Sequence, residues 1–162
     1  MADPKASRPH MPDYGLLDAE SGRGLLPWSW AEERLTRSHN YWVSTTSADG
    51  CPHAMPVWGL WLDGAFWFST AAGSRKARNL TVNANCVITT EHADEAVIVE
   101  GVAEAVGGKA AFKRFADAYK PKYDWDMSAV EDGVFLVRPR VVFGFIEHAD
   151  QFGGSATRWV FE

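Results

Sequence analysis

The sequence has no apolar run that approaches the roughly 20 residues of a membrane-spanning helix, so a helical membrane protein is excluded. The N-terminal stretch MADPKASRPHMPDYG carries Pro, Asp and His where a secretory leader would have an apolar segment. We expect residues 1–26 to form a flexible arm. Positive charge is also scarce: 16 Lys+Arg against 21 Asp+Glu give a net charge of -5, which argues against general binding to nucleic acid or an anionic membrane.

Cysteine is nearly absent as well. The two cysteines, Cys51 and Cys86, have no metal-ligand spacing and form no disulfide framework, so we expect free thiols and a cytoplasmic protein. No acid–base pair stands at a diagnostic spacing. His53 and His92 are candidate proton donors, although a lone histidine is more often a hydrogen-bonding residue of a turn or sheet. The segment EHAD at 147–150 is typical of a solvated turn, and we predict no metal site.

Aromatic residues, in contrast, are abundant. Eight Trp, nine Phe and four Tyr make up 13% of the chain, and many lie in short runs such as WGLWLDGAFWF. Any single one is explained by a β-rich core. As a set they indicate dimerisation or a planar ligand, because large amphipathic rings favour interfaces and flat ligands.

Most of the chain has the period-two pattern of strands. The expected strands are 41–47, 52–62, 65–70, 86–90, 96–106, the segments VFLVRP and VVFGFIEHA, and TRWVF near the end. Three short helices are expected: one within PWSWAEERLTRSH, with Ser29 as N-cap and Glu32 completing a capping box, one at about 75–83 and one at 109–119.

Particular residues predict how these strands connect. Pro56 must interrupt its strand or place it at an edge, Asp63-Gly64 predicts a type I′ hairpin, and Gly101 predicts a bulge. Sequential hairpins favour an antiparallel sheet, and closure into a barrel removes its edges. We therefore expect a mainly β protein with short helices, an antiparallel split β-barrel, as a single cofactor-binding domain over residues 27–162.

Positive charge gathers at one point, in STAAGSRKARNL at 69–80. Ser74 is the expected N-cap of the helix, and Arg75, Lys76 and Arg78 follow it. Cations are unfavourable near a helix N-terminus, whereas an anion is favourable there. The pattern favours a bound anion that offsets the repulsion; the alternative is a surface helix with a solvated basic face. Because an aromatic hairpin precedes this segment, a flat ring system with an acidic tail would use both features.

The stretch GCPHAMPVWGLWLDGAFWFSTAAGSRKARNL resembles the flavin/deazaflavin oxidoreductase family, the pyridoxamine 5′-phosphate oxidase-like split barrels. The matching pattern is G-x-P-x-x-x-P-V-W, a D-G hairpin, a strand that ends in Ser/Thr, and S-x-K-x-x-N-L. It is carried by Gly50, Pro52, Pro56, Val57, Trp58, Asp63, Gly64, Ser69, Thr70, Ser74, Lys76, Asn79 and Leu80. The tail FGFIEHADQFGGSATRWVF is similar to the branch that uses the deazaflavin coenzyme F420.

The resemblance implies a homodimer with two cofactors in grooves at the subunit interface. It assigns the cofactor-binding residues in four groups. Met55, Pro56, Val57 and Trp58 would line the ring system, and Phe68, Ser69 and Thr70 would approach the sugar-like chain. Ser74, Arg75, Lys76 and Asn79 would hold the phosphate, and Arg158 and Trp159 would close the site from the partner subunit.

By the same resemblance, the expected function is hydride transfer from reduced coenzyme F420 to a small electrophile such as an enone, a quinone or a tetrapyrrole. Arg78, Lys120 and Lys122 would meet the oligoglutamate tail of this cofactor. The C-terminal Arg-x-His substrate signature of true pyridoxamine phosphate oxidases is missing, which disfavours vitamin B6 oxidation. Three alternatives stay open: an FMN-dependent oxidoreductase, a cofactor-binding carrier without turnover, and a β-barrel interaction module.

Overall fold

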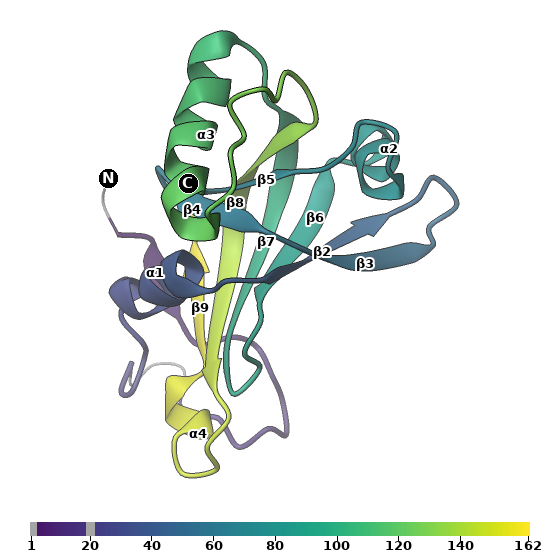
Figure 1. The fold of residues 1–162 in the computed structure, drawn as a ribbon. Helices are drawn as coiled ribbons and strands as arrows, with labels where there is room; N and C mark the ends of the chain where they lie inside the picture. The colour runs from purple at the N-terminus through teal and green to yellow at the C-terminus, as the bar shows by residue number, and fades with distance from the viewer. Residues whose placement is uncertain (1–2, 19–21) are drawn as a thin grey trace.

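The structure, a computed structural model, describes residues 3–18 and 22–162. This part of the chain forms one sheet of nine strands with four helices (Figure 1). The strands are β1 (Lys5–Ser7), β2 (Tyr41–Thr46), β3 (Pro52–Val57), β4 (Gly59–Leu62), β5 (Ala65–Ser69), β6 (Asn85–Thr90), β7 (Glu95–Ala105), β8 (Val134–Ile146) and β9 (Thr157–Val160). The helices are α1 (Trp28–Arg37), α2 (Arg75–Val82), α3 (Lys109–Tyr123) and α4 (Phe152–Ser155).

The sheet is antiparallel and branches at β8. Its main path runs β1-β9-β8-β7-β6-β2-β3, while β5 pairs with β8 and β4 pairs with β5. The first part of β8, Val134–Val137, pairs with β5, and a later part, Val141–Gly144, pairs with β9. β7 runs beside both parts and shifts register between Glu100 and Gly101. The split barrel and the bulge expected at Gly101 are thus confirmed.

Apolar side chains fill two clusters. The larger lies inside the barrel and includes Tyr41, Phe66, Phe68 and Trp159, each with no exposed surface. The smaller lies between the sheet and α3 and is centred on Phe115. The spacing of apolar residues in α3 follows one helical face, so the burial of this face holds the helix on the barrel.

Local signals predict some boundaries and miss others. Asp63 and Gly64 have φ of 55° and 74°, as a type I′ turn requires, and β3 ends next to Trp58, so that 52–62 forms two strands. The predicted capping by Ser29 is wrong: α1 begins at Trp28 and Pro27 is its N-cap, without a side-chain hydrogen bond. α3 was expected to end at Tyr119, but it continues to Tyr123 and contains Pro121. VFLVRP and VVFGFIEHA form the single strand β8.

Part of the segment expected to be a flexible arm is built into the fold. β1 pairs with β9, so Lys5–Ser7 lie beside the last strand of the chain (Figure 1). The buried guanidinium of Arg8 donates to the carbonyl oxygens of Ala156 at 2.9 Å and of Arg23 at 2.8 Å. These bonds tie the described N-terminal residues to the C-terminal end of the barrel, which corrects the expectation for residues 5–8.

Candidate functional site

The N-terminus of α2 presents polar groups that are free to bind an anion. The Ser74 hydroxyl oxygen accepts hydrogen bonds from the Ala77 backbone N–H at 3.1 Å and from the Thr70 hydroxyl at 3.0 Å. Because both bonds use the oxygen as acceptor, the proton of Ser74 remains available to a ligand. The first turn of α2 contains no acidic residue, and Arg75 and Lys76 form no ion pair with any residue that the structure describes.

Asn79 has a different role from the one expected. Its side chain is buried, and its amide nitrogen donates to the Thr45 hydroxyl of β2 at 2.9 Å. This bond ties α2 to the sheet, so the amide faces inward rather than toward a phosphate. Arg78 likewise folds back and donates to the Gly73 carbonyl. Of the predicted phosphate-binding residues, Ser74, Arg75 and Lys76 therefore remain free.

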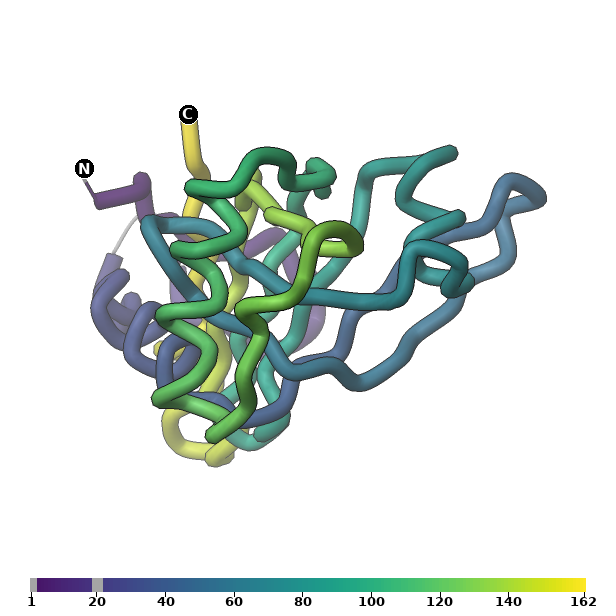
Figure 2. The backbone as a smooth tube through the Cα atoms, turned by 45° about the horizontal axis from the view of Figure 1, so that its top comes forward, coloured from purple at the N-terminus to yellow at the C-terminus, as the bar shows by residue number. Residues whose placement is uncertain are grey.

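β3 forms the open edge of the sheet beside α2 (Figures 1 and 2). It pairs with β2 on one side and, among the described residues, with no strand on the other. Met55 is 43% exposed and Trp58 is 40% exposed, which is unusual for large apolar side chains. An unpaired strand edge with exposed apolar side chains is suited to a flat heterocycle, whose polar edge can bond to the free backbone groups.

A buried polar cluster holds the break between β3 and β4, and no sequence pattern predicts it. The Tyr123 hydroxyl accepts from the Gly59 N–H at 2.9 Å and donates to the carbonyl oxygen of His39 at 2.8 Å or of Gly59 at 2.7 Å. Its ring stacks on Trp58, with centroids 4.9 Å apart and planes 9° apart. The exposed Trp58 side chain thus has a rigid support.

Lys122 belongs to the same cluster. Its ammonium group donates to the Tyr41 hydroxyl at 2.8 Å and to the carbonyl oxygens of Gly59 and Thr36, each at 3.1 Å. Burial lowers the pKa of Lys122 to about 8, and burial raises the pKa of Tyr41 and of Tyr123. The ammonium group makes these inward bonds, so in this structure it does not extend toward a cofactor tail.

The electrostatics of the β2–β3 hairpin link it to α2. Desolvation lowers the pKa of His53, and the nearby charges of Arg75 and Lys76 lower it further. Hydrogen bonds from Ser47 and from backbone groups lower the pKa of Asp49, with a smaller contribution from Arg75. The cations of α2 therefore act on groups of the hairpin, and we use the name cation groove for the part of the surface that carries His53, Met55, Ser74, Arg75 and Lys76.

The remaining predicted site residues differ in their relation to the cation groove. Ser69 ends β5, and the next residue, Thr70, donates to the Ser74 hydroxyl. The Phe68 side chain, in contrast, is fully buried among Phe66 and Phe135. Trp159 is also fully buried and packs edge-on against Trp28, with the ring centroids 5.6 Å apart. This burial does not fit a side chain that closes a partner's site. Arg158 is half-exposed on β9, at the far side of the main sheet path from β3.

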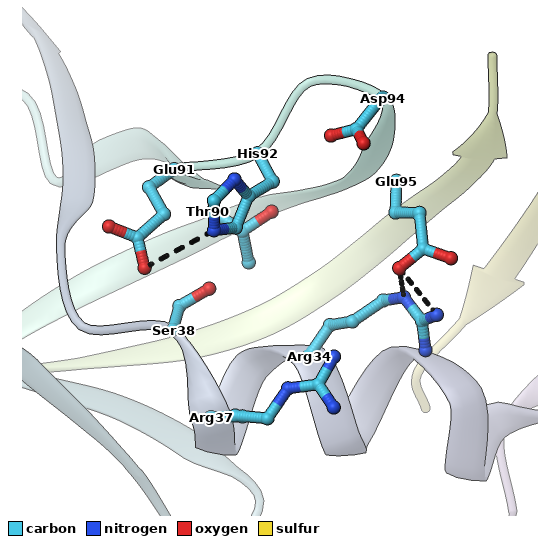
Figure 3. A pocket seen from close by; sticks show the side chains of 8 residues that line it. All are labelled: Arg34, Arg37, Ser38, Thr90, Glu91, His92, Asp94 and Glu95. Atoms are coloured by element: carbon cyan, nitrogen blue, oxygen red, sulfur yellow. Dashed lines mark hydrogen bonds and ion pairs between the residues drawn. The ribbon is translucent and has the colours of Figure 1, made fainter.

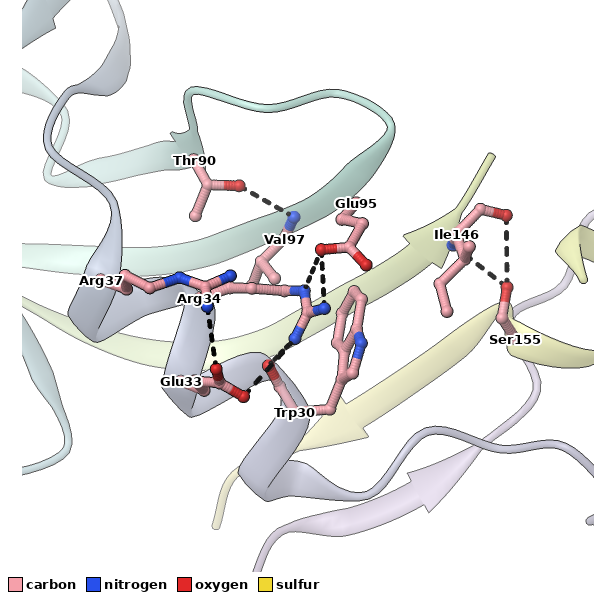
Figure 4. A network of polar contacts seen from close by, with 9 residues as sticks. All are labelled: Trp30, Glu33, Arg34, Arg37, Thr90, Glu95, Val97, Ile146 and Ser155. Carbon is pink, nitrogen blue, oxygen red and sulfur yellow. Dashed lines mark hydrogen bonds and ion pairs between the residues drawn. The ribbon is translucent and has the colours of Figure 1, made fainter. Parts of the chain in front are cut away.

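A separate pocket lies where the C-terminal end of α1 meets the β6–β7 turn (Figure 3). We call it the α1 pocket; its volume is about 300 Å³, and it is lined by Arg34, Arg37, Ser38, Thr90, Glu91, His92, Asp94 and Glu95. Arg34 donates to the Glu95 carboxylate at 2.6 and 3.0 Å, and Arg37 pairs with Glu33 at 3.1 Å (Figure 4). Its two arginines are thus neutralised by neighbouring carboxylates.

The profile of the family described as pyridoxamine 5′-phosphate oxidase matches residues 30–144, which is well over half of the sequence. The chain belongs to this family. A search of the curated proteins finds no match. The matched region contains the whole cation groove, whereas β1 and β9 lie outside it.

Solved structures similar to this pyridoxamine 5′-phosphate oxidase family member support the fold. A conserved hypothetical protein from Mycobacterium tuberculosis has a TM-score of 0.67 at 23% identity, over 76% of this chain and 86% of that one. A heme storage protein from Vibrio cholerae has a TM-score of 0.60 at 18% identity, over 75% of this chain and 95% of that one. A structure named F420 reductase has a TM-score of 0.56 at 20% identity, over 68% and 94%. At these identities the likeness concerns the fold.

Two negative findings complete the description of the site. No helix among the described residues is long and apolar enough to cross a membrane. Residues 3–18 and 22–162 contain no group of three or more His, Cys, Asp or Glu side chains placed to hold a metal ion. Cys51 is exposed, Cys86 is buried, and both are free thiols as predicted.

Proposed function

We propose that this protein binds coenzyme F420 in the cation groove and transfers hydride from its reduced form to an electrophilic small molecule such as an enone, a quinone or a tetrapyrrole. The observation that carries the proposal is the N-terminus of α2, where Ser74 keeps a free hydroxyl proton and Arg75 and Lys76 have no carboxylate partner in the described chain. Such a set of donors and charges fits a phosphate group.

The ring system of the cofactor would lie along β3, against Met55, Pro56, Val57 and Trp58. Pro56 donates no hydrogen bond, and the outer edge of β3 has no partner strand among the described residues, so backbone groups of this strand are open to a heterocycle. When bound, the deazaflavin would supply the hydride. The role of the chain is to grip the phosphate, orient the ring and exclude water from one of its faces.

The outer face of the sheet supports the proposal of a homodimer. Residues directly opposite on antiparallel strands share a face, and the register Pro56↔Trp42↔Thr89↔Ile98↔Phe143↔Arg158 crosses six strands. Trp42 is 47% exposed on this face, opposite to the core. We propose that two copies pair here in an isologous interface, which would bring Arg158 of the partner subunit toward the groove.

An open cavity of about 420 Å³ supports this placement of the interface. Its lining includes Ser44, Thr46, Val87, Glu100 and Val141. Each lies two or four positions along its strand from one of the residues just named, so these residues share the outer face. A second copy laid on this face would cover the cavity.

FMN is the second candidate cofactor, because the free groups at α2 fit its phosphate equally well. A carrier without turnover is the other alternative, since no acid–base pair lies in the cation groove; among structures of the same fold, one is named a heme storage protein. Residues that bind the phosphate do not contact the ring atom that distinguishes a deazaflavin from a flavin, so they do not select between the two cofactors.

Titration of tryptophan fluorescence with each cofactor tests the proposal. Trp58 and Trp42 are exposed and serve as reporters near the proposed site. Tight quenching by coenzyme F420 but not by FMN would support the proposed cofactor. Mixing the reduced cofactor with a panel of enones, quinones and tetrapyrroles then separates an enzyme from a carrier. Absence of binding by either cofactor would contradict the proposal and favour an interaction module.

A further inference from the structure

His53 faces α2 from β3. It lies directly opposite Thr45 in the β2–β3 register, and residues opposite each other share a face. Thr45 accepts the hydrogen bond from Asn79 of α2, so the face that carries His53 is the one packed by this helix. The charges of Arg75 and Lys76 lower the pKa of the His53 imidazole, and the charge of Arg75 also lowers the pKa of Asp49 in the adjacent turn. His53 is therefore part of the wall of the cation groove.

The two nitrogens of His53 differ in their surroundings. Nδ1 is covered by protein and has no hydrogen-bond partner among the described residues, whereas Nε2 is not among the buried unpartnered atoms. A buried N–H without an acceptor costs more than a buried lone pair that could be left unused. The neutral ring therefore places its proton on Nε2. Desolvation and the two neighbouring cations keep the pKa of the ring below its ordinary value, so the neutral form prevails at neutral pH.

We propose that His53 is a cofactor-binding residue, which donates a hydrogen bond from Nε2–H to the phosphate oxygens held by Ser74, Arg75 and Lys76. This inference rests on the proposed function, because it adds a donor to the same phosphate site. A neutral donor suits this position: it offers one more bond to the oxyanion without adding a third charge beside the two cations. It also makes the groove specific for a ligand that carries an oxygen anion there.

Matched ligand pairs isolate the bond. FMN with riboflavin, and coenzyme F420 with its phosphate-free deazariboflavin, differ in the phosphate-bearing part of the molecule. Dissociation constants are measured at pH 8, where the imidazole is neutral, for the wild type, His53→Phe and His53→Gln. Phe keeps the ring without a donor, whereas the amide of Gln places an N–H near the position of Nε2.

We expect His53→Phe to weaken binding of the phosphorylated ligand by about tenfold or more, the scale of a lost hydrogen bond to a charged group. His53→Gln should stay close to the wild type, and neither variant should change binding of the phosphate-free ligand. Equal affinity of wild type and His53→Phe for the phosphorylated ligand would overturn the inference. If the wild type itself does not prefer the phosphorylated member of either pair, the proposed phosphate site fails instead.

Nuclear magnetic resonance gives a second readout that does not depend on affinity. Nitrogen-15 shifts of the histidine side chains in the ligand-free protein, assigned by the signal that His53→Gln removes, report the tautomer. We expect a neutral ring protonated at Nε2. A ring protonated at Nδ1 would contradict the inference, because Nε2 would then have no proton to donate.

Discussion

The cation groove and the α1 pocket contain the same kinds of side chain but differ in how their charges are balanced. In the α1 pocket, Arg34 lies against Glu95 at 2.6 Å, and Arg37 lies against Glu33 at 3.1 Å (Figures 3 and 4). In the cation groove, Arg75 and Lys76 have no carboxylate partner in the described chain. The paired charges contribute to the fold, whereas the unpaired cations are those that the proposed ligand would neutralise.

The largest effect on stability is expected at Arg34. Its side chain is only 14% exposed, it makes two bonds to Glu95, and its guanidinium lies 3.8 Å from the centre of the Trp30 ring. Arg34→Ala should lower the free energy of unfolding by about 2 kcal/mol, because it removes the bonds to the partly exposed Glu95 and leaves a gap over Trp30. Urea unfolding of wild type and variant measures the change. An unchanged midpoint would mean that this pocket does not hold the fold.

Lys76→Ala should have the opposite profile. Because Lys76 makes no ion pair in the described chain, its loss should leave the free energy of unfolding nearly unchanged and weaken cofactor binding by about 1–3 kcal/mol. Fluorescence titration with coenzyme F420 and FMN measures the affinity. Lys109→Ala is the matched control, since Lys109 is an exposed residue at the start of α3 and is not among the predicted site residues. Equal affinity of Lys76→Ala and wild type would remove Lys76 from the site.

Asn79 distinguishes positioning from binding within the cation groove. Asn79→Ala removes the bond between α2 and Thr45 and should lower the free energy of unfolding by about 1–2 kcal/mol. Any loss of affinity should then be recovered in Asn79→Ser to the extent that the bond to Thr45 is restored. If Asn79→Ala leaves stability unchanged but abolishes binding, the amide contacts the ligand after all.

The sequence predicted the local features of this comparison and missed the distant ones. Ser74 as N-cap, the Asp63-Gly64 turn and the break near Pro56 each depend on a few neighbouring residues, so they could be recognised without the fold. The support of Trp58 by Tyr123 joins residues that are 65 positions apart by the numbering, and no local pattern announces it. The Lys122 bonds depend in addition on α3 continuing through Pro121, which helix rules disfavour.

The direction of side chains was the second feature that limited the prediction of the site from the sequence. Phe68 and Trp159 were assigned to the site by resemblance, but alternate residues of a strand point to opposite faces, and both of these face the core. Asn79 shows the same limit on a helix, because its amide faces β2 instead of the helix N-terminus. A motif names the residues that matter, and the packing of the whole sheet decides which of them can touch a ligand.

The smallest expected effect concerns Lys122, a cation that is neither paired with a carboxylate nor free. Burial lowers its pKa to about 8, below its value in the unfolded chain, so between that pH and about 10.4 the unfolded chain binds more protons than the folded one. The contribution of Lys122 to the free energy of unfolding therefore rises with pH in this window, by at most about 1.4 kcal/mol per pH unit. Lys122→Met should lack this rise.

Urea unfolding from pH 7.5 to 9.5 measures the difference in free energy of unfolding between wild type and variant. This difference isolates the contribution of Lys122 from that of Cys86, whose pKa burial raises to about 12. A difference that stays constant across this range would show that the ammonium group is solvated, and that the cluster under Trp58 does not depend on a desolvated charge.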